Sequence, residues 1–322
     1  MIGLIVRRLL QMPVILLVIY TITFLLAWSL PGESLLNDEG RRPPQSVIDQ
    51  MNREYDLDNP YRFYANYLYN ASGVRWVVAG VTGGERPRWI FNFGPSFKYD
   101  DWSVNELIGS SLPVSIVLGL SAIILALVIG LTAGIIGALR PNSLADLVTL
   151  LVALVGISLP SFVTGTVLLV IFSVWLRVFA IAQWGSLQDM ILPAVTLSLP
   201  FAAYIARLTR MGMIDALGAD YIRTARAKGA SNMSLHLRHA LKNAFLPVLS
   251  YLGPAAAYAM TGSFVVERVF NVPGIGQHFV SAVQNKDLFL IMGVVLVFAT
   301  MLIFFNLAVD LMYRWIDPRI EQ

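Results

Sequence analysis

Six apolar segments, each long enough to cross a lipid bilayer as a helix, run through this chain of 322 residues. A helix needs about 20 predominantly apolar residues to cross the roughly 30 Å hydrocarbon core. Charged residues make up only 13% of the chain, against about 25% in a soluble globular domain. The sequence therefore predicts an all-α polytopic membrane protein with six transmembrane helices. The predicted spans are Leu9–Leu30, Leu112–Leu139, Leu144–Leu176, Ile191–Met211, Phe245–Val266 and Leu288–Met312.

The third run, Leu144–Leu176, is too long for one upright crossing and contains Pro160. Splitting it there leaves halves of about 16 residues, each of them short for a span. Six spans with a cytoplasmic amino terminus place Arg7 and the cations between Arg207 and Lys242 inside, as the positive-inside rule requires. A seventh span would move this main cation cluster outside. We therefore predict one long helix, tilted or kinked at Pro160, and cytoplasmic amino and carboxyl termini.

Residues 31–110 separate the first span, within residues 1–30, from the other five and are predicted to form a small extracytoplasmic subdomain. "QSVIDQMNREY", entered after Pro43–Pro44, and "NPYRFYANYLYN" predict two short helices, the second with an aromatic face. "RWVVAGVTGGERPRWIFNF" predicts a hairpin that turns at Gly83–Gly84. A segment of about 80 residues with few aliphatic side chains is expected to lean on the membrane part or on a partner.

Ionisable side chains are scarce in the predicted spans and lie near their ends; they are Asp146, Arg177, Arg207, Arg210 and Asp310. Ion-coupled carriers place such groups in the middle of the bilayer, where each costs about 2.5–3.5 kcal/mol. The sequence contains no Walker-type loop, no HExxH and no GxSxG. Without cysteines and with three histidines, a metal site lacks ligands. We expect a non-catalytic chain that holds no cofactor and takes its energy from another chain.

The second span carries Gly119, Gly130, Gly134 and Gly137 at spacings that suit close helix packing. Small residues on one helix face let a neighbouring backbone approach. We interpret these glycines as packing positions in a helical bundle.

The cations concentrate in one stretch, "YIRTARAKGASNMSLHLRHALKNAFLPV", from Tyr221 to Val248. Asp220 is a suitable N-cap for a helix of about two turns, and Gly229 suits a left-handed exit from it. Ser231 or Asn232 then caps a second helix. The stretch thus predicts a helix–glycine–helix protrusion on the cytoplasmic face. Positive-inside bias and contact with anionic lipid would also explain the charge, so a protein-docking role stays open on these residues alone.

The same stretch resembles the cytoplasmic EAA loop of binding-protein-dependent ABC importer permeases, in the variant typical of peptide and nickel permeases. "IVRRLLQMPVILLVIYTITFLL", "FGPSFKYDDWSVNELI", "GSFVVERVFNVPGIGQ" and "VDLMYRWIDPRI" resemble further segments of that family in the same order. The consensus Glu-Ala-Ala falls on Arg223-Thr224-Ala225, and Leu246-Pro247 lies farther beyond Gly229 than in sugar permeases. The peptide group shares both departures.

The resemblance implies a type I ABC importer permease fold, with residues 111–322 as the permease core and residues 212–243 as its cytoplasmic coupling loop. The partners implied are a second permease subunit, two cytoplasmic ATPase subunits that bind ATP and Mg, and an extracytoplasmic binding protein that delivers peptide. The implied location is a bacterial or archaeal cytoplasmic membrane. The residues implied in ATPase coupling are Tyr221, Arg223, Thr224, Ala225, Arg226, Ala227, Lys228 and Gly229.

Several alternatives stay open at this point. Within the family, the solute is a peptide, a nickel complex or another small molecule. Outside it, a passive channel, a secondary carrier or a membrane assembly protein share this composition, but none of these needs a docking protrusion. The sequence selects neither the residues that line a path nor a role for residues 74–89.

Overall fold

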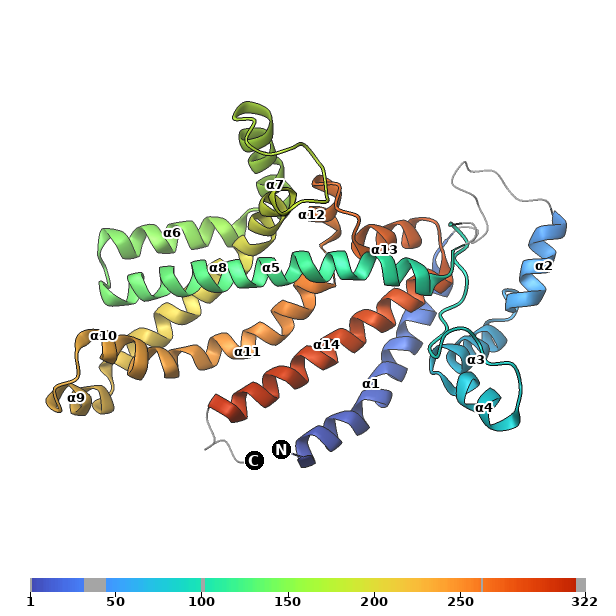
Figure 1. The fold of residues 1–322 in the computed structure, drawn as a ribbon, viewed down its shortest axis with the longest axis horizontal. Helices are drawn as coiled ribbons and strands as arrows, with labels where there is room; N and C mark the ends of the chain where they lie inside the picture. The colour runs from blue at the N-terminus through green and yellow to red at the C-terminus, as the bar shows by residue number, and fades with distance from the viewer. Residues whose placement is uncertain (1, 32–44, 100–101, 262, 317–322) are drawn as a thin grey trace. The chain divides into compact units, whose positions relative to one another are not determined.

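The computed structural model describes residues 2–31, 45–99, 102–261 and 263–316, and these residues are overwhelmingly helical (Figure 1). In this part of the chain the only β pairing is an isolated bridge between Pro95 and Ser103. The elements are α1 (Ile2–Ser29), α2 (Gln45–Tyr55), α3 (Pro60–Ala71), α4 (Val74–Thr82), α5 (Val104–Leu139), α6 (Leu144–Ser158), α7 (Ser161–Leu169), the π-helix η1 (Val170–Trp175), α8 (Leu187–Gly218), α9 (Asp220–Ala227), α10 (Asn232–Ser234), the π-helix η2 (Leu235–Ala240), α11 (Leu241–Met260), α12 (Phe264–Val269), α13 (Ile275–Gln284) and α14 (Leu288–Ile316).

Five of the described helices are long and apolar enough to cross a membrane, and a bent pair supplies a sixth span if the pair is counted as one. The five are Ile5–Ser29, Val104–Leu139, Leu187–Gly218, Asn232–Val269 and Leu288–Met312. The predicted all-α polytopic fold is therefore confirmed.

The bent pair is the third apolar run, where α6 and the segment Ser161–Trp175 meet at 106°. The prediction located this bend at Pro160 but described a tilt or kink within one helix, whereas the structure has two helices. Leu159 is extended, with φ −81° and ψ 128°, because a residue before proline is pushed out of the helical region. Pro160 also lacks the N–H that would continue the helical hydrogen bonds. The local sequence thus ends α6 completely.

The described residues divide into two compact units. The amino-terminal unit comprises residues 2–113 and 274–301. The core unit comprises residues 114–273 and 302–322, described here as far as residue 316. The long helices α5 and α14 contribute residues to both units.

Glycines bring α5 into backbone contact with its neighbours in the core unit. A Cβ atom added to Gly134 would lie 2.6 Å from the carbonyl oxygen of Ala206 in α8, and one added to Gly130 would lie 2.7 Å from that of Ala202. Gly119 approaches the backbone of α11 in the same way. Separations of this kind leave no room for a side chain. The interpretation of these glycines as packing positions is confirmed.

Aromatic rings form the centre of the amino-terminal unit. Phe63 and Tyr67 on α3 stack at 5.9 Å between ring centroids, and Phe63 meets Phe289 of α14 at 5.3 Å. Tyr20 of α1 donates a 2.6 Å hydrogen bond to the carbonyl oxygen of Tyr64. The predicted helix with an aromatic face is confirmed as α3, and that face holds the segment together.

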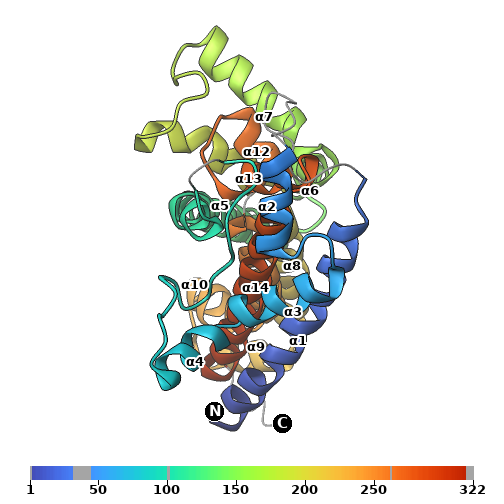
Figure 2. The ribbon, with the colours of Figure 1, turned by 90° about the vertical axis from the view of Figure 1, so that its right-hand side faces the viewer.

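The hairpin predicted for Arg75–Phe93 is wrong, because the first part of this segment lies in the helix α4, which packs beside α3 (Figure 2). Its valines, Val74, Val77, Val78 and Val81, recur with helical spacing, which the hairpin interpretation overlooked. Gly83 then ends the helix in the left-handed region, with φ 73°. The other predicted helix of the segment is α2, which begins at Gln45; the preceding Pro43–Pro44 lie outside the described residues.

A buried carboxylate joins the segment before α5 to the start of α14 within the amino-terminal unit. Asp287 is fully buried and accepts hydrogen bonds from the Ser96 hydroxyl (2.6 Å), the Phe97 N–H (2.9 Å) and the Leu290 N–H (3.1 Å). Burial raises the pKa of Asp287, and these hydrogen bonds act in the opposite direction. Because about 190 residues separate Ser96 from Asp287, the sequence alone gave no reason to expect this contact.

Replacing this carboxylate by a methyl group is expected to loosen the amino-terminal unit. Asp287→Ala leaves buried donors without an acceptor, which costs about 3 kcal/mol. Limited proteolysis of the purified protein over a temperature series should show cleavage between α3 and α5 at lower temperatures than in the wild type. Glu85→Ala, at an exposed position in the same unit, is the control and should behave as the wild type. Equal resistance of both variants would contradict the role of Asp287.

Candidate functional site

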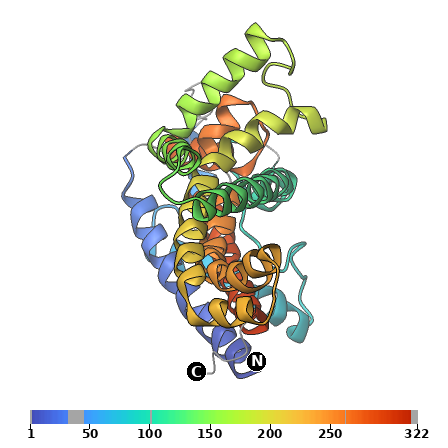
Figure 3. The same cartoon turned by 90° about the vertical axis from the view of Figure 1, so that its left-hand side faces the viewer.

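The cationic stretch forms a compact tip beyond the ends of α8 and α11 in the core unit (Figure 1), and this tip faces the viewer in Figure 3. The chain leaves α8, turns at the extended Ala219 and enters α9. Gly229 has a φ of 83°, and the Ser231 hydroxyl accepts a hydrogen bond from the Ser234 N–H at the start of α10. The predicted helix–glycine–helix form is therefore present.

One detail of that prediction is wrong. Asp220 does not flank the helix as its N-cap, because α9 begins at Asp220 itself and Ala219 flanks it. Alanine has no oxygen with which to cap a backbone N–H. Asp220 instead places its carboxylate in the first turn, where the helix dipole favours a negative charge, and pairs with Arg223 at 3.4 Å.

A Schellman arrangement closes the carboxyl end of α9. The Ala230 N–H donates to the Ala225 carbonyl oxygen (3.1 Å), and the Gly229 N–H donates to that of Arg226 (3.0 Å). Both bonds depend on the left-handed backbone conformation of Gly229. Nothing lies within 4 Å of the position of a Cβ atom on Gly229. Glycine is thus needed here for its backbone conformation and not for space.

A single apolar side chain anchors α9 to the rest of the core unit. Ile222 is 1% exposed and lies in a cluster with Met213 of α8 and Ala244 of α11. The hydroxyl of Tyr221 accepts a 2.9 Å hydrogen bond from Asn243 of α11. The short helix is therefore held from one side against two long helices.

The predicted coupling residues occupy the other side. Seven of them are exposed, namely Tyr221, Arg223, Thr224, Arg226, Ala227, Lys228 and Gly229, while Ala225 is partly buried against the cluster around Ile222. Ile222 and Asn243, which fix the orientation of this face, were not predicted. Ile222 is the only aliphatic residue larger than alanine in α9, and this was the signal that could have identified it.

A buried ion pair lies two turns of α8 before this tip. Asp146, 2% exposed, receives the Arg210 guanidinium through two hydrogen bonds of 2.5 and 2.7 Å. The Asn142 N–H adds a third at 2.8 Å. Both charged residues lie near the ends of predicted spans, but their positions in the sequence gave no reason to pair them. Together they attach the start of α6 to α8, the helix that carries the tip.

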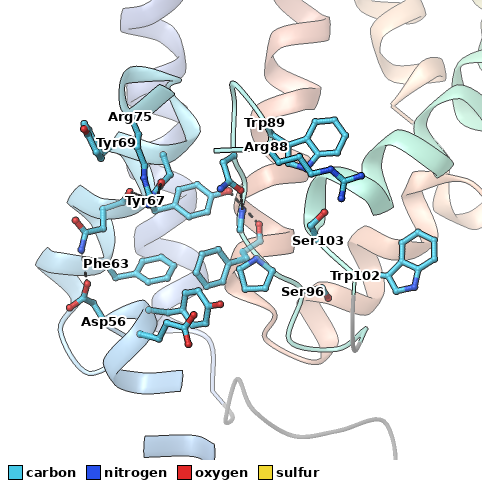
Figure 4. A pocket seen from close by; sticks show the side chains of 18 of the residues that line it. Asp56, Phe63, Tyr67, Tyr69, Arg75, Arg88, Trp89, Ser96, Trp102 and Ser103 are labelled. Carbon is cyan, nitrogen blue, oxygen red and sulfur yellow. Dashed lines mark hydrogen bonds between the residues drawn. The ribbon is translucent and has the colours of Figure 1, made fainter. Parts of the chain in front are cut away.

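A pocket lies in the amino-terminal unit (Figure 4). This pocket has a volume of about 950 Å³ between α3 and the segment that leads into α5. Its walls combine aromatic rings such as Tyr67 and Trp102 with charged groups from α2, α4 and α5. Arg88 on its rim pairs with Glu106 at 2.8 Å. The pocket and the cationic tip belong to different units of the fold.

Comparison with known proteins covers the whole chain. Residues 126–322 match the family described as "Binding-protein-dependent transport system inner membrane component", and residues 1–119 match its N-terminal counterpart. The dipeptide transport system permease protein DppB of Bacillus subtilis is 38% identical over 98% of this chain and 97% of its own. The oligopeptide transport system permease proteins OppB of Haemophilus influenzae and Escherichia coli are 39% and 40% identical over the full length of both chains.

A solved structure agrees at the level of the fold. The crystal structure of an amino acid ABC transporter with histidines matches with a TM-score of 0.51 and 16% identity, over 66% of this chain and 94% of the other. At that identity the likeness shows the fold alone. The resemblance read from the sequence is confirmed by these matches. This chain belongs to the family of binding-protein-dependent ABC importer permeases, the multi-pass inner membrane components of these transport systems.

Proposed function

We propose that this chain is the permease subunit of an ATP-driven importer that moves peptides into the cytoplasm. The observation that carries the proposal is the full-length similarity to permeases of oligopeptide and dipeptide transport systems, together with a cationic tip presented on a buried anchor. The working complex contains a second permease, two cytoplasmic ATPase subunits that bind ATP and Mg, and an extracytoplasmic binding protein. Both termini of this chain lie in the cytoplasm.

Within this complex, α9 is the coupling helix. Its exposed residues, from Tyr221 to Gly229, seat in a groove of one ATPase, and closure of the ATPases displaces the helix. Ile222 and the hydrogen bond from Asn243 to Tyr221 transmit that displacement to α8 and α11. A contact that transmits motion needs a rigid connection on its inner side, and the buried anchor supplies it. A loop that only touched lipid headgroups would not need one.

Reconstitution of the complete complex in liposomes tests this function. ATP hydrolysis and uptake are measured with a panel of di- to oligopeptides and nickel chelates, each delivered by the binding protein. We expect peptide to stimulate hydrolysis and to accumulate inside only with ATP. Uptake without ATP would indicate a channel, uptake driven by an ion gradient would indicate a secondary carrier, and failure to retain an ATPase would indicate an assembly protein. Uptake of nickel chelates but not of peptides would indicate that nickel chelates are the substrate.

The exposed valines of α4 make the extracytoplasmic segment a candidate contact for the binding protein. Val77 and Val81 are 57% and 83% exposed on this helix, and apolar residues that gather on one exposed face mark interaction sites. Replacing both by serine should raise the concentration of binding protein needed for half-maximal uptake by about fivefold, or roughly 1 kcal/mol. Gln50→Ser on α2, also exposed, should change nothing. An unchanged concentration for the valine variant would remove α4 from this interface.

A further inference from the structure

One exposed face of the core unit has the wrong chemistry for contact with lipid. On α8, Tyr204 is 40% exposed near the middle of the helix, and Arg207 is exposed one turn further on. On α11, Ser250 and Tyr258 are exposed, Tyr258 by 65%. We call these four residues and Pro254 the polar face. Hydroxyl and guanidinium groups inside a span are costly in hydrocarbon and usually turn toward protein or a water-filled cavity.

The two helices hold this face together through aromatic contacts. The ring of Tyr204 lies against that of Tyr251 in α11, with centroids 4.4 Å apart. Tyr258 meets Phe201 of α8 edge-on at 6.1 Å. Since α8 and α11 pack along each other, these two contacts place Tyr204 and Tyr258 at the seam between the helices.

The outer surface of α6 supplies a contrast within the same unit. Its exposed residues include Leu147, Leu151, Leu154 and Val155, each between 51% and 61% exposed. All four are aliphatic, as a lipid-facing surface requires. We therefore expect the α6 surface to contact lipid and the polar face to contact protein or water.

A proline adds a backbone acceptor to the polar face. Pro254 lies inside α11 and is exposed. It has no N–H, so it cannot donate the helical hydrogen bond to the carbonyl oxygen four residues earlier, at Ser250. In a membrane such carbonyl groups need another donor, from protein or from a water-filled cavity. The backbone N–H groups of a peptide are donors of this kind.

We propose that the polar face lines the substrate path and contacts the main chain of the transported peptide, an inference that rests on the proposed function. The hydroxyls of Tyr204 and Tyr258 bond to peptide groups in either direction, since a hydroxyl both donates and accepts. The Ser250 hydroxyl donates to the Leu246 carbonyl oxygen and accepts from the peptide. The tyrosine rings accept varied apolar side chains. Arg207, nearer the end of α8 that carries the tip, attracts the peptide carboxylate. Contacts to the main chain suit a transporter that accepts many peptide sequences.

The absence of cysteine from this chain makes a direct test possible. Ser250→Cys and Tyr258→Cys are introduced singly into the complete complex in membrane vesicles, with Leu151→Cys and Leu154→Cys on α6 as lipid-facing controls. A charged, water-soluble thiol reagent is added, and modification of this chain is followed by mass. We expect the polar-face cysteines to react and the α6 cysteines to react about a hundredfold more slowly, because a charged reagent is excluded from hydrocarbon.

Transported peptide should then protect Ser250→Cys and Tyr258→Cys from the reagent, and completed modification should abolish uptake. Reaction rates as slow as those on α6 would overturn the proposal. Burial of this face against the second permease would give this result. Fast reaction that peptide does not slow would also overturn it. Uptake by the wild-type complex is scored separately: a wild type that imports only nickel chelates contradicts the proposed function, and protection by a chelate but not by peptide contradicts the peptide contact.

Discussion

Gly229→Val is expected to leave the protein in the membrane and to abolish transport. Gly229 has a φ of 83°, where a side chain costs roughly 1–2 kcal/mol and a β-branched one costs more. No atom lies within 4 Å of the new Cβ position, so the penalty comes from the backbone alone. Relief of that strain breaks the Schellman bonds and swings the axis of α9. Because Ile222 anchors only one side of α9, its contacts to the ATPase would be misaligned.

Two variants separate geometry from charge in this experiment. Gly218→Val lies at the end of α8, also with no atom within 4 Å of the added Cβ and without a positive φ, and should transport far better than Gly229→Val. Arg226→Ala removes an exposed charge, and exposed ion pairs are typically worth 0–1 kcal/mol. ATPase retention and peptide uptake are measured for all three variants. Normal transport by Gly229→Val together with loss in Arg226→Ala would mean that charge, rather than helix geometry, holds the ATPase.

Gly134→Val should prevent the core unit from assembling. The added Cβ would lie 2.6 Å from the carbonyl oxygen of Ala206, and a helix backbone cannot move aside as a flexible side chain can. We expect a loss of roughly 3 kcal/mol or more, measured as reduced protein in the membrane and a lower thermal unfolding temperature in detergent. Gly109→Val in the same helix meets no atom within 4 Å and controls for the low helix propensity of valine. Equal stability of the two variants would contradict direct backbone contact between α5 and α8.

The sequence predicted elements whose cause is local. Apolar run length identified the spans, the aromatic spacing identified α3, and Gly229 identified the end of α9. The hairpin prediction failed because valine favours strands by propensity, whereas the spacing of the valines in this segment is helical. The bend at Pro160 was located correctly, but its angle of 106° depends on what α6 and α7 pack against, which local sequence does not encode.

The exposed residues of the candidate site could be predicted from the sequence. The residues that attach α9 to α8 and α11 could not. The exposed cations of α9 could be identified from their charge and from the family resemblance. Asn243 could not, because it lies 22 residues from its partner Tyr221. The ion pair of Asp146 and Arg210 spans 64 residues. Such pairs form because the helices have already packed, so one sequence without its fold gives no reason to connect them. That these residues couple to an ATPase stays a prediction.

The continuity of α8 has a mechanical consequence. This helix runs for 32 residues, or about 48 Å at 1.5 Å per residue, and its carboxyl end is joined directly to α9. A tilt of only about 5° around one end would therefore carry the other end by roughly 4 Å, comparable to the width of a peptide backbone. Since Tyr204 lies near the middle of α8, it would move by about half that amount. If α8 pivots about its far end, a displacement of the end joined to α9 passes along the helix in proportion to the distance from the pivot, so one rigid element carries motion of the tip to Tyr204.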